Sequence, residues 1–477
     1  MNTRLVVNYL SQIVLYFSLV FTIPLAAAIR YHEDVYAFAI PMAVCAFLGS
    51  IVYVISKPES DVAKYKEGYA IVGIGWLLIA IAGSIPYVYY SISPVDAFFE
   101  AMSGFTTTGA TIIDRIEDLP KSLLLWRSLT QWLGGMGIVV LFVAIFPTLA
   151  KKSETLLQAE VPGLKVEKIK PRLKDTALRL YATYMLLTVL EIVLLYILGM
   201  SLYDAVNHTF TTLSTGGFST HTESIAYFNS PAIEFVIFIF MILGGMNFVL
   251  IYLLLKGQTK FLRDTEFRFY MAILLLAGAI MTAINLERFE LGESLRYSFF
   301  QVASIMTTTG YTTFDFDTWS DSARLLLLML MFVGGSTGST GGGIKVVRIY
   351  LLTVYSLGQI LKSAEPRTAR IVRLNDEVVD KETLHNITAF FTLYVLIFVL
   401  STFLVSLTGL DMISSISAVS ATINNVGPGL GAVGAAESYS SLSATAKLIL
   451  AFNMWIGRLE LFTVLSLFIP SFWRERW

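Results

Sequence analysis

Four short stretches rich in threonine and glycine hold the residues of this chain that could do chemistry. They are TTTG at 106–109, LSTG at 213–216, TTTG at 307–310 and NNVG at 424–427. Glycine allows backbone conformations that strain other residues, so it can aim carbonyl groups at a common point. Carbonyl oxygens arranged in this way can replace the hydration shell of a monovalent cation. The four stretches contain no Asp or Glu, so a carboxylate ring for a divalent cation is not expected.

The residues predicted to bind the cation come from the end of each stretch. In the fourth stretch asparagines replace threonines, and their amide oxygens could either face the ion or pack behind it. The predicted set is Thr107, Thr108, Gly109, Ser214, Thr215, Gly216, Thr308, Thr309, Gly310, Asn425, Val426 and Gly427.

Each stretch occupies the same place in a longer pattern. It follows a short apolar segment, such as 94–105 or 203–213, that is too short to cross a membrane. It precedes an apolar span with a second glycine site, at Gly134-Gly135, Gly244-Gly245, Gly334-Gly335 and Gly457. A pattern repeated four times in register predicts four similar units. We expect four pseudo-symmetric units of helix, re-entrant pore loop and helix around one pore, with the loops meeting at its centre.

The composition indicates a membrane protein. Of the 477 residues 55% are hydrophobic and 14% are charged, whereas soluble domains carry about 25% charged residues. Runs of about 20 apolar residues can cross a bilayer as helices. We therefore predict an all-α polytopic protein with ten crossing helices and four re-entrant ones. The single cysteine and the four scattered histidines argue against a disulfide framework or a metal cluster.

The apolar spans divide the chain into an N-terminal hairpin and four units. The first span, 5–29, ends in small residues as a signal peptide would, but a second span follows at once, so we expect both to remain as two extra transmembrane helices. The predicted divisions are 1–66 (two-helix hairpin), 67–150 (repeat 1), 151–176 (cytoplasmic linker), 177–256 (repeat 2), 257–352 (repeat 3 with a gating loop), 353–383 (cytoplasmic linker) and 384–477 (repeat 4).

Basic residues gather between the units, whereas the loops at 114–118 and 315–321 lean acidic. The positive-inside rule places the basic linkers in the cytoplasm and the four glycine loops toward the outside of the cell. The basic runs have two explanations, which are topology alone or a docking surface for a cytosolic partner.

A second concentration of glycine lies inside the second span of repeat 3. The run GGSTGSTGGG at 334–343 weakens a helix, since each glycine costs about 1 kcal/mol relative to alanine. We expect two half-helices joined by a loop that acts as a movable gate. The alternatives are a close-packed seam of small residues or a phosphate cradle, although Lys345 does not complete a phosphate-binding motif. The predicted gate residues are Gly334, Gly335, Gly338, Gly341, Gly342, Gly343, Lys345 and Arg458.

Arg458 lies near the middle of the apolar segment 447–470, where the other repeats carry a second glycine. A charge at that depth costs at least about 2.5 kcal/mol, so it should face water or a partner. We expect it to stand below the loops as a barrier to cations. An ion pair with Glu460 or Glu234 is the alternative, and Lys345 could simply extend toward the membrane surface.

The four loops, the run GGSTGSTGGGIK at 334–345 and the segment NMWIGRLELFT at 453–463 resemble the pore subunits of the Trk/Ktr/HKT superfamily of potassium transporters. The resemblance covers nearly the whole chain, and the two extra N-terminal spans are most similar to the bacterial Trk subunits. It implies potassium as the ion held at the loop residues, an intramembrane gating loop at 334–343 and a pore arginine at Arg458. A serine at the first filter glycine accompanies sodium transport in this superfamily, so Gly109 favours potassium.

The resemblance also implies partners. It implies a homodimer in the bacterial inner membrane, with one pore in each subunit. A cytosolic ring of TrkA type, which binds ATP, ADP or NAD(H), would open the gate, and this chain itself would hold no cofactor other than the transported K⁺.

Three other functions compete with a gated potassium channel. The first is a symporter that couples potassium to sodium or protons, although few ionisable residues lie inside the spans. The second is an intramembrane enzyme, and we find none of the expected catalytic motifs. The third is a structural scaffold, which would not need four glycine loops in register.

Overall fold

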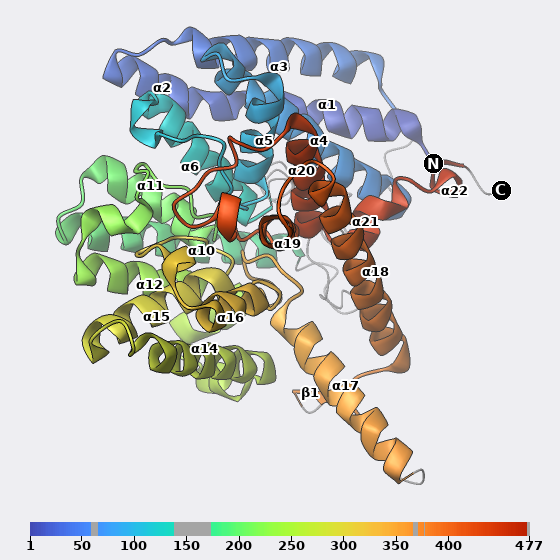
Figure 1. Cartoon of the computed structure of the whole chain (residues 1–477). Helices are drawn as coiled ribbons and strands as arrows, with labels where there is room; N and C mark the ends of the chain where they lie inside the picture. The colour runs from blue at the N-terminus through green and yellow to red at the C-terminus, as the bar shows by residue number, and fades with distance from the viewer. Residues whose placement is uncertain (59–64, 138–172, 366–370, 376, 475–477) are drawn as a thin grey trace.

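The computed structural model describes residues 1–477 except 59–64, 138–172, 366–370, 376 and 475–477, and the fold is nearly all helical (Figure 1). Six of the described helices are long and apolar enough to cross a membrane. The prediction of an all-α polytopic protein is therefore confirmed. The described strands are β1 (Arg373–Leu374) and β2 (Glu377–Val378), which form one short antiparallel pair.

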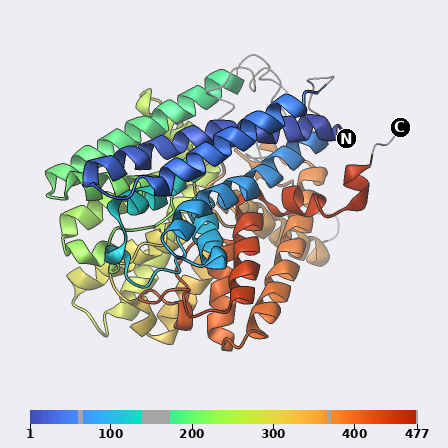
Figure 2. The same ribbon diagram turned by 90° about the horizontal axis from the view of Figure 1, so that it is seen from above.

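The N-terminal hairpin covers one side of the molecule (Figures 1 and 2). Helix α1 (Thr3–Ser18) runs through the 3₁₀ turn η1 (Leu19–Phe21) into α2 (Thr22–Tyr31), and α3 (Tyr36–Ile55) returns beside it. Gly49 allows the close approach, because a side chain there would lie 2.9 Å from the backbone nitrogen of Leu15.

Four groups of helices follow one another round the rest of the molecule, from blue through green and yellow to red (Figure 1). The first group is α4 (Tyr65–Tyr89), α5 (Pro94–Phe105), η2 (Ile116–Asp118) and α6 (Lys121–Gly135). The second is α10 (Leu173–Ile197), α11 (Leu202–Leu213), η3 (Ser224–Phe228), α12 (Pro231–Gly245) and α13 (Phe248–Leu255), followed by η4 (Thr259–Arg263). The third is α14 (Thr265–Asn285), α15 (Leu291–Met306), η5 (Phe316–Thr318), α16 (Asp321–Met331) and α17 (Val346–Ala364). The fourth is α18 (Lys381–Ser406), α19 (Met412–Ile423), η6 (Gly431–Val433), α20 (Ala444–Leu459), α21 (Leu461–Ser466) and α22 (Pro470–Trp473).

Each group holds one short helix, namely α5, α11, α15 or α19. These helices have 12 to 16 residues, which is about 18–24 Å at 1.5 Å per residue and less than the hydrocarbon core of a bilayer. Three of them start at a capping side chain, because Ser93, Ser201 and Asp411 each accept a hydrogen bond from a backbone N–H of the first turn.

The helices that follow the short helices end early, which differs from the prediction. We expect a break only in repeat 3, but α6, α12, α16 and α20 end at Gly135, Gly245, Met331 and Leu459. Helices α12 and α13 meet at a bend of 112°. Glycines near these ends allow close packing on the short helices, since a side chain at Gly134 would lie 1.9 Å from the Phe105 carbonyl oxygen and one at Gly457 would lie 2.1 Å from that of Ile423. Residues 151–172 of the predicted linker 151–176 lie outside the described residues.

Candidate functional site

The four short helices end in the same hydrogen-bonded turn. At the end of α5, the Thr107 N–H donates to the Gly104 carbonyl at 3.0 Å and the Thr108 N–H donates to the Ser103 carbonyl at 2.9 Å. The same two bonds close α11, α15 and α19, with the donor pairs Thr215 and Gly216, Thr308 and Thr309, and Asn425 and Val426. This is the Schellman turn, whose first residue beyond the cap is left-handed. The φ angles there are 54° at Thr107, 54° at Thr215, 62° at Thr308 and 55° at Asn425.

The turns define four central loops, at residues 106–110 (loop 1), 214–218 (loop 2), 307–311 (loop 3) and 424–428 (loop 4). Two residues after the left-handed position, Gly109, Gly310 and Gly427 have φ angles of 82°, 82° and 102°. The equivalent residue of loop 2 is Gly217, with φ 74°, and not Gly216.

The predicted set for loop 2 is therefore displaced by one residue. Ser214 corresponds to Thr106 at the helix end, and Thr215, Gly216 and Gly217 correspond to Thr107, Thr108 and Gly109. Two adjacent glycines leave this register ambiguous in the sequence, because either could match the single glycine of the other loops. Gly217 is thus a residue that the sequence prediction missed.

The four loops touch one another in a closed ring. A side chain added at Gly109 would lie 2.2 Å from the Gly216 carbonyl oxygen, which joins loop 1 to loop 2. A side chain added at Gly217 would lie 1.9 Å from the Thr309 carbonyl oxygen, which joins loop 2 to loop 3. Side chains added at Gly310 and Gly427 would lie 2.1 Å from the Val426 oxygen and 2.7 Å from the Thr108 oxygen, which joins loop 3 to loop 4 and loop 4 to loop 1. The structure therefore brings the predicted loop residues together, although they come from four distant parts of the chain.

A cavity of about 330 Å³ opens on one face of this ring. All four left-handed glycines line it, which are Gly109, Gly217, Gly310 and Gly427. Two carboxylates, Asp114 and Glu437, also line the cavity, together with Arg127. The Arg127 charge is balanced, because its side chain forms a fully buried ion pair with Glu100 at 2.8 Å.

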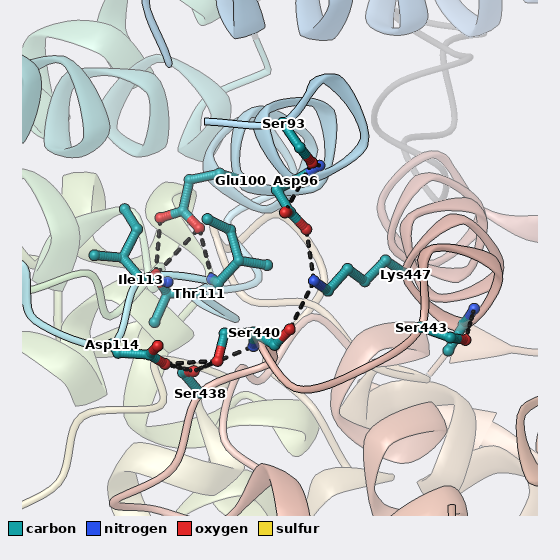
Figure 3. A network of polar contacts seen from close by, with 12 residues as sticks. Ser93, Asp96, Glu100, Thr111, Ile113, Asp114, Ser438, Ser440, Ser443 and Lys447 are labelled. Atoms are coloured by element: carbon teal, nitrogen blue, oxygen red, sulfur yellow. Dashed lines mark hydrogen bonds and ion pairs between the residues drawn. The ribbon is translucent and has the colours of Figure 1, made fainter. Parts of the chain in front are cut away.

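Polar contacts hold the segment after loop 1 against the segment after loop 4 (Figure 3). The Asp114 carboxylate accepts hydrogen bonds from the Ser438 hydroxyl and, at 2.6 Å, from the Ser440 hydroxyl. The hydrogen bonds from these two hydroxyls hold the pKa of Asp114 below its usual value, and the bond from Ser438 has the larger effect. Nearby, the Lys447 ammonium bridges the Asp96 carboxylate at 2.6 Å and the Ser440 carbonyl at 2.9 Å. We call the contacts of Asp114 with Ser438 and Ser440 the outer clasp.

Comparable contacts join the other neighbouring segments on the cavity side. The Thr222 N–H donates to Glu117 at 2.8 Å, the Ala226 N–H donates to the Thr312 carbonyl at 3.2 Å, and the Gly431 N–H donates to Asp317 at 3.0 Å. The segments that follow the four loops are therefore connected in the same cyclic order as the loops.

The glycine-rich loop (residues 332–345) connects α16 to α17 and contains all six predicted gate glycines. Its backbone packs against the central loops through residues that do not line the cavity. The Gly342 N–H donates to the Thr308 hydroxyl at 2.7 Å, and a side chain at Gly342 would lie 2.4 Å from the Asn424 carbonyl oxygen. The Thr340 hydroxyl donates to the Leu213 carbonyl at 2.8 Å. The loop therefore contacts the ends of α11, α15 and α19.

The same loop satisfies carbonyl groups at the end of α12. The Ser336 N–H donates to the Gly245 carbonyl at 2.8 Å, and the Thr340 N–H donates to the Gly244 carbonyl at 3.2 Å. A buried carboxylate, Glu266 at the start of α14, accepts the Thr337 N–H at 2.6 Å. The sequence prediction missed Glu266. The one feature that could have pointed to this residue is its charge at the start of an apolar span.

Arg458 lies at the end of α20, and its guanidinium joins three backbone carbonyls. It donates to Thr340 at 2.7 Å, to Gly134 at 2.5 Å and to Gly135 at 2.8 Å. The side chain therefore connects the glycine-rich loop to the end of α6. The apolar segment expected to run through Arg458 is interrupted just after it, because Glu460, with φ 65°, separates α20 from α21.

The two carboxylates expected as alternative partners of Arg458 pair with other arginines. Glu460 pairs with Arg348 at 2.8 Å, and Glu234 pairs with Arg296. Lys345 also differs from the expectation of a side chain that extends toward the membrane surface, because its ammonium donates to the Gly341 carbonyl within the same loop. Within the described residues, no group of three or more His, Cys, Asp or Glu side chains could hold a metal ion.

Comparison with known proteins is consistent with this arrangement. The family model of TrkH, described as a cation transport protein, matches residues 35–475. The Trk system potassium uptake protein TrkH of Salmonella typhimurium is 39% identical, and the TrkG protein of Escherichia coli K12 is 35% identical, each over 100% of both chains. The crystal structure of the potassium transporter TrkH from Vibrio parahaemolyticus covers 99% of this chain and all of its own, with a TM-score of 0.89 and 34% identity. The chain therefore belongs to the TrkH family of Trk system potassium uptake proteins, which are multi-pass membrane transporters and not enzymes.

Proposed function

We propose that this chain admits potassium ions to the cell through a gated, channel-like pore whose selectivity filter is the ring of four central loops. The closed contact of loops 1 to 4 carries this proposal, because it brings one backbone carbonyl of each loop, those of Thr108, Gly216, Thr309 and Val426, to the contact with its neighbour. Irregular backbone at membrane depth is tolerated where it lines water or is buried in protein. A ring that faces a cavity on one side meets this condition.

The chemistry of the ring suits a monovalent cation. Carbonyl oxygens can replace the water around K⁺ without adding net charge. The four short helices end at the ring, so their C-terminal partial negative charges favour a cation there. Asp114 and Glu437 at the cavity would raise the local concentration of cations before they reach the filter.

The glycine-rich loop and Arg458 form the gate in this proposal. The loop packs on the ring through Gly342 and is fastened to α6 by the Arg458 guanidinium. Opening would require these hydrogen bonds to break or rearrange. The positive charge of Arg458 and the ammonium of Lys345 would hinder cations while the loop remains in place.

The surroundings of the pore are part of the proposal. We assign the chain to the cytoplasmic (inner) membrane, with its basic linkers in the cytoplasm, on the basis of its charge distribution and family. The resemblance supports a homodimer and a TrkA-type cytosolic ring that binds nucleotides and moves the glycine-rich loop.

Flux measurements in liposomes test the function. With a voltage imposed and no gradient of sodium or protons, we expect potassium to enter through the purified protein, at a rate that rises when the regulatory ring is added. Uptake that strictly requires a sodium or proton gradient would contradict the channel proposal and support a symporter. Absence of flux with the ring present and voltage imposed would also contradict it.

A further inference from the structure

Gln131, on α6, contacts the backbone of loop 2 at the point where it meets loop 1. The side chain is fully buried, and its amide makes two hydrogen bonds to that loop. The amide N–H donates to the Gly216 carbonyl at 2.7 Å, and the amide oxygen accepts the Phe218 N–H at 3.0 Å. One side chain from the first group of helices therefore binds both sides of Gly217.

The carbonyl that Gln131 binds lies where loop 2 contacts loop 1. The Gly216 oxygen is the atom that a side chain at Gly109 would approach to 2.2 Å. The amide of Gln131 thus fixes an oxygen that is in direct contact with loop 1. The Schellman turn of loop 2 does not depend on Gln131, because its own backbone hydrogen bonds close it.

Gln131 also explains why loop 2 has two glycines. The positions that correspond to Gly216 in the other loops carry the side chains of Thr108, Thr309 and Val426. A side chain built at Gly216 would lie 2.4 Å from the amide carbon of Gln131. The amide therefore occupies the space that a loop side chain fills elsewhere, so Gly216 and Gln131 form a complementary pair.

We infer that Gln131 is a positioning residue of the filter, which sets ion selectivity by holding the loop 2 backbone at its junction with loop 1. This inference rests on the proposed function of the ring. Selectivity among monovalent cations depends on the position and field of the oxygens that replace the hydration shell. Without the amide, the Gly216 carbonyl and the Phe218 N–H lose their partners and the junction can rearrange.

The test compares wild type with Gln131→Met, which keeps the length of the side chain and removes both hydrogen bonds. Voltage-driven potassium and sodium fluxes in liposomes are measured, and the K⁺/Na⁺ flux ratio is the readout. We expect the ratio to fall by about fivefold, the factor that corresponds to one hydrogen bond of ordinary strength. Gln12→Met is the matched control, because this partly buried glutamine on α1 donates only to Asn8 at 2.8 Å and lies away from the loops. Its flux ratio should equal that of wild type.

A second variant separates the donated hydrogen bond from packing. Gln131→Glu has the same shape, but its carboxylate lacks the N–H that reaches Gly216, whereas its protonated form restores a donor. We expect a K⁺/Na⁺ flux ratio that falls as the pH rises from about 5 to about 9, the range in which buried carboxyl groups titrate. Wild type, with an amide at 131, should show no such fall.

Two outcomes are distinguishable. A wild-type flux ratio in folded Gln131→Met or Gln131→Glu protein, with normal conduction, would overturn the role of Gln131 and leave the proposed pore intact. Loss of voltage-driven flux in wild type itself would instead refute the proposed function.

Discussion

Three of the four central loops place a threonine in the left-handed region, at Thr107, Thr215 and Thr308. A β-branched residue rarely adopts that conformation, which costs about 1–3 kcal/mol and persists only where the surroundings enforce it. The hydroxyl of Thr308 accepts the Gly342 N–H. In loop 4, Asn425 tolerates the conformation better, and its amide donates to the Thr108 hydroxyl at 2.9 Å and to the Met454 carbonyl at 3.0 Å. At Thr308 and Asn425, the side chain therefore connects the ring to a neighbouring segment.

The bond between Thr308 and Gly342 gives a prediction for the gate. Thr308→Val keeps the β-branched shape but leaves the buried Gly342 N–H without its acceptor, which costs about 1–3 kcal/mol. We expect a lower thermal midpoint and a higher basal potassium flux in the purified protein alone, without the proposed regulatory ring. Thr392→Val, on an exposed part of α18, is the control. Unchanged midpoint and flux in Thr308→Val would show that this bond does not hold the loop.

Arg458 gives a second prediction at the same scale. Arg458→Gln removes a positive charge below the ring and cannot reach all three carbonyls, so basal potassium flux should rise and thermal stability should fall. The control is Arg288→Gln, because the Arg288 guanidinium also donates to a backbone carbonyl, that of Thr318, but on an exposed loop. A fall in flux would mean that Arg458 supports conduction instead of opposing it.

Individual residues were predictable where a pattern repeats and unpredictable where a partner lies far away in the chain. The glycines of loops 1, 3 and 4 stand at equivalent positions in the ring, whereas the doubled glycine concealed the register of loop 2. Three partners of Arg458 are backbone carbonyls more than 100 residues away, and every residue type has a carbonyl. The ion pairs that the sequence offered as the alternative for Arg458 involve Glu460 and Glu234, and both of these carboxylates pair with other arginines.

At the scale of helices, the second glycines let the returning helices pack closely on the short helices. Gly134 and Gly457 lie against the carbonyl oxygens at the ends of α5 and α19. The helices cannot approach so closely with any larger residue. The sequence identified these glycines but did not reveal that the helices end beside them, because an apolar run looks continuous whether or not its helix is broken.

This packing predicts a strong position dependence for glycine substitutions. Gly457→Ala would place a carbon 2.1 Å from the Ile423 carbonyl oxygen, so α20 or α19 must shift, at a cost of about 3 kcal/mol or more. Gly292→Ala is the control, because nothing lies within 4 Å of the new carbon and its helix should gain up to about 1 kcal/mol. Thermal unfolding in detergent measures both. Equal midpoints for the two variants would contradict the packing argument.

Over the whole molecule, the central ring is reinforced by contacts between the segments that follow its loops. The outer clasp joins residues 324 positions apart, since Asp114 accepts from Ser438. The cyclic order of the units follows from the fourfold pattern in the sequence. The outer clasp could not be predicted from the sequence, because short polar side chains in loops carry no signal of their distant partners.

The clasp predicts an acid dependence of stability. Its hydroxyls lower the pKa of Asp114 in the folded protein, so the stabilisation is fully present above the unfolded pKa of about 3.9 and is lost as the pH falls through the folded value. Asp114→Asn should therefore lower the thermal midpoint at neutral pH, and its difference from wild type should shrink below about pH 4. Asp118→Asn removes an exposed pair at 3.7 Å and should have little effect at either pH. A constant difference between wild type and Asp114→Asn across this range would contradict the role of the carboxylate.

The central claim is that ions pass through the ring of loops, and Gly310→Ser tests it most directly. A side chain at Gly310 would meet the Val426 carbonyl oxygen at 2.1 Å, so the ring must change shape where loops 3 and 4 touch. The measurement is the ratio of voltage-driven potassium flux to sodium flux in liposomes, with Gly292→Ser as the control in open space. We predict a several-fold fall in the ratio for Gly310→Ser and none for the control. An unchanged ratio in a folded, conducting Gly310→Ser protein would show that the ions take another path.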